Sequence, residues 1–190
     1  KLAYRIYKDG FFPDVIYVSL RGGAYLGNVI SEYFKILRRE DEGRPVYYAA
    51  VVARSYTGVA AAEQVKVEGW TYNPEHLRVG DKVLLVDDIF DTGRTINHLT
   101  QIILEKGIPR RDLKVAVHDY KYYVDKPKQL PIQPDYWCRK LELSINDEDK
   151  WIHYLSHELV GLTAEELEKH YYGDDPELRK ILGSLTQRPL

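Results

Sequence analysis

The fold is constrained most by short apolar runs that alternate with stretches of helical periodicity. The run at residues 83–86 is followed by apolar residues at helical spacing, among them Ile96, Leu99 and Ile103, and this stretch ends near Gly107. Similar apolar runs occupy residues 15–20, 47–53 and 114–118. Strands that are apolar on both faces and alternate with helices form a parallel sheet covered on both sides. We therefore expect an α/β fold with a mainly parallel sheet.

The length of the chain limits it to one main domain. It has 190 residues, of which 44% are hydrophobic and 29% charged, enough for one sizeable core. The alternation ends near residue 120, and a capping box at residues 163–166 and Pro176 then predict two short helices. We expect a domain over residues 1–160, with a small hood at about 121–160, and a helical C-terminal extension over residues 161–190.

Charge and cysteine content exclude several classes of protein. There are 27 basic and 29 acidic side chains, so the basic excess typical of nucleic-acid binding is absent. The single cysteine, Cys138, excludes an internal disulfide and favours a reducing compartment. No apolar run approaches the roughly 18 residues of a membrane span, and no signal-peptide pattern opens the sequence. We expect a cytoplasmic protein without nucleic-acid or membrane partners.

Acidic residues stand where the strand at residues 83–86 ends. Asp87 and Asp88 follow it directly, and residues 91–95 form the turn into the next helix. Free N–H groups at a helix N-terminus suit a phosphate. Ionised carboxylates accept hydrogen bonds from hydroxyls or bind a divalent cation. The combination indicates a ligand with a phosphate near a vicinal diol, such as a ribose 5-phosphate.

Other interpretations of the same acids are possible. An acid pair can simply cap a turn. The G-x-x-x-x-G-K-[ST] motif of nucleoside triphosphatases is absent from the sequence, which argues against that class. A phosphatase with an acidic nucleophile would have its acids two residues apart, whereas Asp88 and Asp91 are three apart.

Residues 83–96, "VLLVDDIFDTGRTI", closely resemble the phosphoribosyl-pyrophosphate (PRPP) binding motif of type I phosphoribosyltransferases. The Asp-Thr-Gly form of the loop resembles the 6-oxopurine members, which act on hypoxanthine, guanine or xanthine. The resemblance implies that Asp87 and Asp88 hold the ribose hydroxyls and help to organise Mg²⁺. It also implies a loop that binds the 5-phosphate, made of Asp91, Thr92, Gly93, Arg94 and Thr95.

Two more segments extend the resemblance toward the N-terminus. Residues 20–23, Leu-Arg-Gly-Gly, resemble the family's pyrophosphate loop, in which Arg21 and Gly22 would face the leaving group. The family often has a non-proline cis peptide at this position. Ser55 and Tyr56 resemble the Ser-Tyr pair of the flexible lid, here residues 54–70. An ordinary turn and a surface ribbon are the respective alternatives.

The purine-binding part of the resemblance lies toward the C-terminus. Lys121 resembles the lysine that reads the purine O6, although Lys126 and Lys128 are close enough to leave the register open. Trp151 would stack on the base, and Ile152 would contribute main-chain contacts. Glu158 stands where certain members place an acid near the metal. Solvated lysines and a core tryptophan are the alternatives.

The resemblance implies transfer of ribose 5-phosphate from PRPP to a purine, with Mg²⁺ as cofactor and Asp91 as general base. A homodimer or homotetramer is the family expectation. Some 6-oxopurine members carry Pro-Trp after the stacking aromatic, whereas this chain has Tyr154-Leu-Ser156, so the choice among hypoxanthine, guanine and xanthine stays open. The alternative function is a PRPP-binding regulatory protein without base chemistry.

Overall fold

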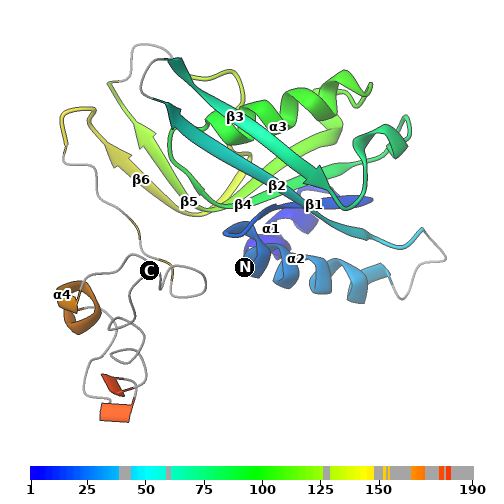
Figure 1. Ribbon diagram of the computed structural model, residues 1–190. Helices are drawn as coiled ribbons and strands as arrows, with labels where there is room; N and C mark the ends of the chain where they lie inside the picture. Colours follow the sequence, from blue (N-terminus) through cyan, green and yellow to red (C-terminus); the bar gives the residue numbers. More distant parts are fainter. Residues whose placement is uncertain are drawn as a thin grey trace. The chain divides into compact units, whose positions relative to one another are not determined.

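The computed structural model describes most of the chain in two compact units, Lys1–Asp149 and Lys150–Leu190 (Figure 1). The described residues are 1–38, 44–58, 61–125, 129–147, 152, 154, 164–169, 176–177 and 179–180. Within them, no helix is long and apolar enough to cross a membrane.

The first unit is built on a six-stranded sheet in the order β3-β2-β1-β4-β5-β6. Its strands are β1 (Val15–Leu20), β2 (Tyr47–Gly58), β3 (Ala61–Trp70), β4 (Val83–Phe90), β5 (Leu113–Tyr123) and β6 (Tyr136–Leu143). The β2–β3 pair is antiparallel, and the other four neighbouring pairs are parallel. The predicted mainly parallel α/β sheet is confirmed.

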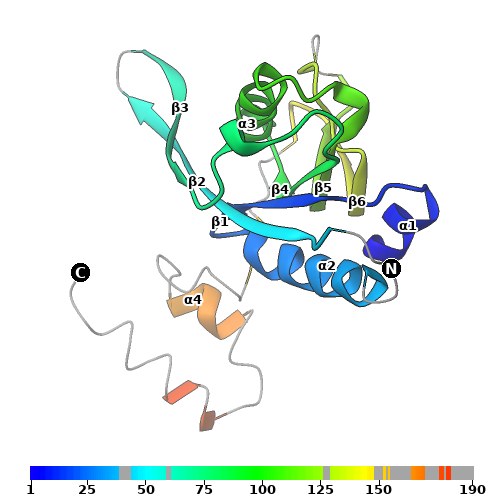
Figure 2. The ribbon, with the colours of Figure 1, turned by 90° about the vertical axis from the view of Figure 1, so that its right-hand side faces the viewer.

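Helices cover both faces of the sheet, as predicted (Figure 2). The helices α1 (Leu2–Lys8) and α2 (Gly23–Arg38) pack on one face, and α3 (Arg94–Glu105) packs on the other. Two short 3₁₀ turns, η1 (Pro74–His76) and η2 (Arg110–Asp112), lie in the connections before β4 and β5. In the second unit α4 (Ala164–Leu167) begins within the predicted capping box at residues 163–166.

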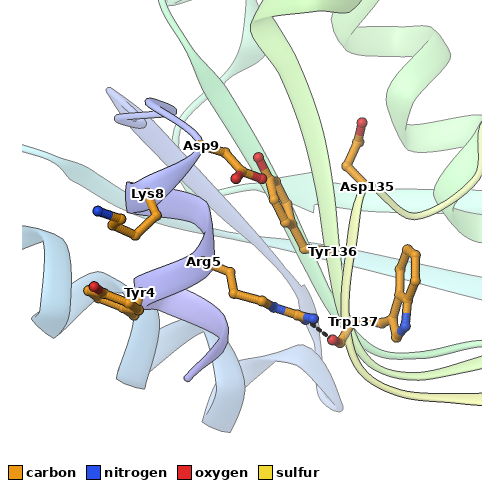
Figure 3. A pocket seen from close by; sticks show the side chains of 7 residues that line it. All are labelled: Tyr4, Arg5, Lys8, Asp9, Asp135, Tyr136 and Trp137. Carbon is orange, nitrogen blue, oxygen red and sulfur yellow. Dashed lines mark hydrogen bonds between the residues drawn. The ribbon is translucent and has the colours of Figure 1, made fainter.

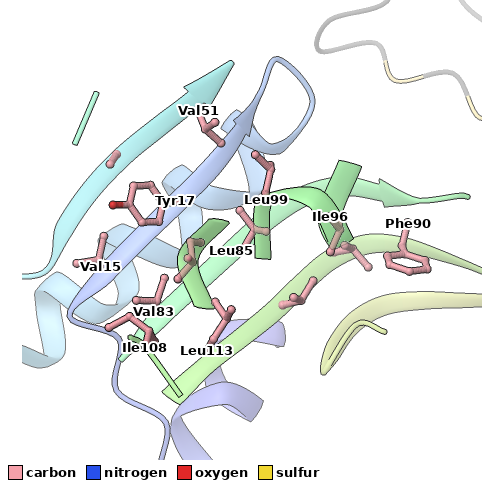
Figure 4. Close-up of a cluster of buried hydrophobic side chains, with 14 of the residues drawn as sticks. Val15, Tyr17, Val51, Val83, Leu85, Phe90, Ile96, Leu99, Ile108 and Leu113 are labelled. Carbon is pink, nitrogen blue, oxygen red and sulfur yellow. The ribbon is translucent and has the colours of Figure 1, made fainter. Parts of the chain in front are cut away.

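The central strand β4 is apolar on both faces, which produces two cores. Val83 and Leu85 belong to the cluster beneath α3 (Figure 4), whereas Leu84 and Val86 belong to the cluster beneath α1 and α2. All four side chains are completely buried. This is the alternation expected of a strand between two layers of helices. The expected strand end at residue 86 is wrong: pairing with β5 continues to Phe90, so Asp87 and Asp88 lie within β4.

Polar residues extend the sheet further than the apolar runs predict. Within residues 54–70, expected as a lid, the end of β2 and the whole of β3 form an antiparallel ribbon with register shifts at Val52/Ala53 and Tyr56/Gly58. Similarly, β5 continues past residue 118 to Tyr123. Its added part includes the buried polar residues Asp119 and Lys121. Apolar periodicity does not predict a strand whose side chains are largely polar.

Candidate functional site

The ends of β1 and β4 meet at the carboxyl edge of the sheet, where open α/β folds bind ligands. Val18 pairs with Val86, so the turn after β1 reaches the acids after Val86. A Cβ atom on Gly22 would lie 2.2 Å from the carboxylate of Asp88. Only glycine fits this approach without displacing the acid. The Leu20–Arg21 peptide is cis, as the family resemblance implies, and Arg21 is exposed.

The two acids occupy different environments. Asp87 is only 8% exposed, and its Oδ1 accepts a hydrogen bond of 3.0 Å from the N–H of Asp88. Burial, followed by the charge of Asp88, raises the pKa of Asp87 well above its usual value, although a hydrogen bond from Ser19 acts in the opposite direction. Asp88 is partly exposed, and its Oδ1 accepts from the N–H of Ile89 at 2.8 Å. Asp88 is therefore the acid better placed to meet a ligand.

This acid pair fits the way in which proteins hold Mg²⁺. The ion is usually bound by one or two carboxylates together with substrate phosphates. Asp87 and Asp88 supply such a pair, and no cluster of three or more His, Cys, Asp or Glu side chains suited to a metal occurs within the described ranges. Mg²⁺ bound here would neutralise charge on a pyrophosphate. Glu158, the third predicted ligand, lies outside the described residues.

The predicted phosphate loop joins β4 to α3. Gly93 is the N-cap of α3 and has φ +77°, a conformation that favours glycine. A Cβ atom there would lie 2.2 Å from the ring of Phe90. The first turn of α3 contains no acidic residue. Thr92, Gly93, Arg94 and Thr95 thus lead into a helix N-terminus that is free of acids, an arrangement that suits an anion.

Lys121 lies beside Asp91, across the β4–β5 pair. The register places Phe90 opposite Tyr120, and the next residues bring Lys121 Nζ to 3.5 Å from Asp91 Oδ2. The lysine side chain is 1% exposed and that of Asp91 31%. The structure thus joins two predicted site residues from different segments. Lys126 and Lys128, the other candidates, lie outside the described residues.

Sequence analysis missed a third member of this group. The hydroxyl of Tyr123 donates to Asp91 Oδ1 at 3.2 Å. Tyr123 is two residues after Lys121, and side chains two apart on a strand point to the same face. That spacing was the available signal, but it has meaning only once β5 is known to continue beyond residue 118.

A buried carboxylate with two half-exposed partners near the same edge was also not expected from the sequence. Asp119 is 0% exposed and contacts His118 Nδ1 at 2.9 Å and the Nε of Arg139 on β6. A buried carboxylate needs such partners. Asp119 therefore ties β6 to β5 close to Lys121.

For the remaining predicted site residues the structure gives little or no side-chain information. Ser55 pairs with Val65 and Tyr56 with Gln64 in the β2–β3 ribbon. Ile152 is partly buried and belongs to the second unit. Trp151, like Glu158, lies outside the described residues.

A cavity of about 300 Å³ lies at the other end of β6, between α1 and the start of the strand (Figure 3). Its walls include Tyr4, Arg5, Asp9 and Tyr136, and Arg5 donates a hydrogen bond to the carbonyl of Trp137. Because β6 begins at Tyr136, this cavity is at the amino edge of the sheet, away from the acids of β4.

Similar proteins identify the family. Residues 1–153 match the phosphoribosyl transferase domain family. "Bifunctional protein PyrR" from Microcystis aeruginosa (strain NIES-843 / IAM M-2473) is 27% identical over 146 residues, which are 76% of this chain and 77% of that protein. The protein of the same name from Latilactobacillus sakei subsp. sakei (strain 23K) is 31% identical over 86 residues, and the match spans only 45% of either chain.

Solved structures show the same fold. A purine phosphoribosyltransferase from Pyrococcus horikoshii Ot3 has a TM-score of 0.54 and 20% identity, covering 80% of this chain and 88% of that one. Hypoxanthine phosphoribosyltransferase from Trypanosoma cruzi, in complex with its product IMP, has a TM-score of 0.52 and 22% identity, covering 74% and 72%. The sheet, the turns at its carboxyl edge and the family match together place the chain in the type I phosphoribosyltransferase family.

Proposed function

We propose that this protein transfers ribose 5-phosphate from PRPP to a 6-oxopurine base, with Mg²⁺ as cofactor, and releases a nucleoside monophosphate and pyrophosphate. The observation that carries this proposal is the pairing of Lys121 with Asp91. A cation that can meet a purine O6 and a carboxylate that can take a proton from a ring nitrogen stand together beside the phosphate loop.

In the proposed complex, each part of PRPP is bound by a different element of the fold. The N-terminus of α3 would hold the 5-phosphate, Asp88 the ribose hydroxyls, and Arg21 the pyrophosphate. As a purine nitrogen bonds to the anomeric carbon, the bond from that carbon to the pyrophosphate oxygen breaks, and its electron pair leaves with pyrophosphate. The purine proton passes to Asp91, and Lys121 stabilises negative charge on O6. The β2–β3 ribbon would act as a lid that excludes water.

The names of similar proteins support two candidates. Structures named as purine and hypoxanthine phosphoribosyltransferases favour a purine substrate. A second candidate is a PRPP-binding regulatory protein without base chemistry, and the relatives named "Bifunctional protein PyrR" support it only in that their name indicates more than one role. Both candidates need the acids of β4, but only the transferase needs the Lys121–Asp91 pair.

The test is pyrophosphate release from PRPP and Mg²⁺ when hypoxanthine, guanine, xanthine, adenine and uracil are supplied separately. We expect turnover with at least one 6-oxopurine and none with adenine or uracil. PRPP binding without turnover on any base would instead support the regulatory protein. Turnover with uracil alone would contradict the purine assignment while leaving the transferase class in place.

A further inference from the structure

We propose that Tyr123 is a positioning residue that fixes the Asp91 carboxylate and so determines which of its oxygens accepts the purine proton. The inference rests on the proposed transferase function. Its basis is that the two oxygens of Asp91 contact different donors on β5, Lys121 Nζ at Oδ2 and the Tyr123 hydroxyl at Oδ1.

The two donors to Asp91 respond differently when a purine binds, because one is charged and the other is neutral. Lys121 is the charged donor, with Nζ 3.5 Å from Oδ2, and in the proposed reaction it turns toward the purine O6. The Tyr123 hydroxyl is neutral and remains at 3.2 Å from Oδ1. When Lys121 turns to the base, Oδ2 loses a donor, while Oδ1 stays held by Tyr123.

The proton-transfer step then has a defined acceptor. The N–H bond of the purine ring breaks and the proton bonds to Asp91 Oδ2. The electron pair of that N–H bond stays in the ring, so the nitrogen that attacks the anomeric carbon becomes more nucleophilic as the bond to pyrophosphate breaks. A carboxylate free to rotate would meet the base in the required orientation less often. Tyr123 contributes by holding that orientation without contacting the substrate.

The neighbouring tyrosine provides a matched control. Tyr122 points to the opposite face of β5, where its ring lies 5.8 Å from the ring of Tyr120 in an edge-on contact and 4.1 Å from Lys140 Nζ. Tyr122→Phe removes a hydroxyl from the same strand but leaves Asp91 untouched. Both substitutions keep the aromatic ring, so neither creates a cavity.

The experiment compares Tyr123→Phe with Tyr122→Phe in the full chain, with the purine that the wild type uses best. We expect Tyr123→Phe to lower kcat about tenfold, the usual effect of losing one hydrogen bond to a charged group. The KM for PRPP should stay within about twofold, because the phosphate loop and Asp88 are unchanged. Tyr122→Phe should keep the wild-type kcat. Thermal unfolding of both variants checks that each is folded.

A double-mutant cycle separates positioning from a structural role. If Tyr123 acts through Asp91, adding Tyr123→Phe to Asp91→Ala should cost no further activity. An equal loss in both backgrounds, or a Tyr123→Phe variant with wild-type kcat, would overturn the inference. A wild type that is inactive with every base would instead overturn the proposed function, so the two failures are distinguishable.

Discussion

At the level of single residues, the three aspartates of the site lie in three different environments. Asp87 is buried beneath the edge, Asp88 is partly exposed above it, and Asp91 is paired with Lys121 and Tyr123. The environment of each carboxylate determines its chemistry. In the proposed reaction Asp87 and Asp88 supply the carboxylate pair for Mg²⁺, Asp88 also meets the ribose hydroxyls, and Asp91 faces the base.

Asp87→Asn should stabilise the free protein at neutral pH. Since burial raises the pKa of Asp87 above 3.8, the folded state holds this proton more tightly than the unfolded state, and stability falls as pH rises above 3.8 toward the folded pKa. Asparagine removes that cost and can still accept from the Asp88 N–H. We expect a higher Tm than that of the wild type at pH 7.

Thermal unfolding without PRPP or metal, measured from pH 4 to pH 8, checks this prediction. The advantage of Asp87→Asn should shrink toward pH 4, because the carboxyl of the unfolded wild type then begins to regain its proton and the folded state loses less by burying it. An advantage that is independent of pH, or a variant less stable than the wild type at pH 7, would contradict the assigned cause.

Asp91→Asn should lower turnover far more than it weakens PRPP binding. The amide oxygen still accepts from Tyr123, but the side chain no longer takes a proton, and a general base typically contributes about 10²–10⁴-fold. The measurements are kcat with a 6-oxopurine and the Kd of PRPP by calorimetry. Equal losses in kcat and in PRPP affinity would refute the role of base.

At the scale of elements, the sequence predicted what apolar periodicity can reveal. It located β1, the first half of β4, α2 and α3, and it indicated the acids of β4 and the turn that follows, because these segments carry regular apolar patterns or a specific motif. It did not reveal the end of β5 or the length of the β2–β3 ribbon, whose residues are polar. The contact of Tyr123 with Asp91 depends on pairing between strands, which no local pattern encodes.

Gly22→Ala tests the contact between the turn after β1 and the end of β4. The new methyl group would lie 2.2 Å from the Asp88 carboxylate, so the turn or the acid must move. Activity and PRPP binding should fall at least tenfold, since a displacement of about 1 Å at a site can cost about 10²-fold, while the two apolar cores stay intact.

The check on Gly22→Ala is PRPP affinity together with thermal unfolding. Gly69→Ala is the control for stability, because a Cβ there has nothing within 4 Å. Wild-type PRPP affinity in Gly22→Ala would show that the close approach of the turn is unimportant for binding.

At the level of the whole molecule, the residues that stabilise the fold and the candidate site residues lie in different parts of the first unit. The two cores lie on the faces of the sheet, whereas the acids, the phosphate loop and Lys121 gather at its carboxyl edge. The family match ends at residue 153, close to the end of the first unit at Asp149. The acids, the phosphate loop and Lys121 are therefore all supplied by the first unit.

Phe34→Ala should reduce stability without changing the chemistry of the folded protein. Phe34 is completely buried in the core beneath α1 and α2, and its ring contacts those of Phe12 and Tyr33. We expect a loss of about 3–5 kcal/mol in unfolding free energy, measured by urea unfolding. Tyr25→Ala, at a side chain 73% exposed on the same helix, should change it by less than about 0.5 kcal/mol. A large drop in kcat per folded molecule of Phe34→Ala would show that core and site are not separate.

The transfer of ribose 5-phosphate to a 6-oxopurine can be checked by identifying the product. PRPP, Mg²⁺ and all five bases are incubated together with the protein, and the nucleoside monophosphates formed are identified by mass spectrometry and compared with the pyrophosphate released. We expect the monophosphate of hypoxanthine, guanine or xanthine, in amounts equal to pyrophosphate. Formation of only adenine or uracil nucleotide, or of no nucleotide while PRPP is bound, would contradict it.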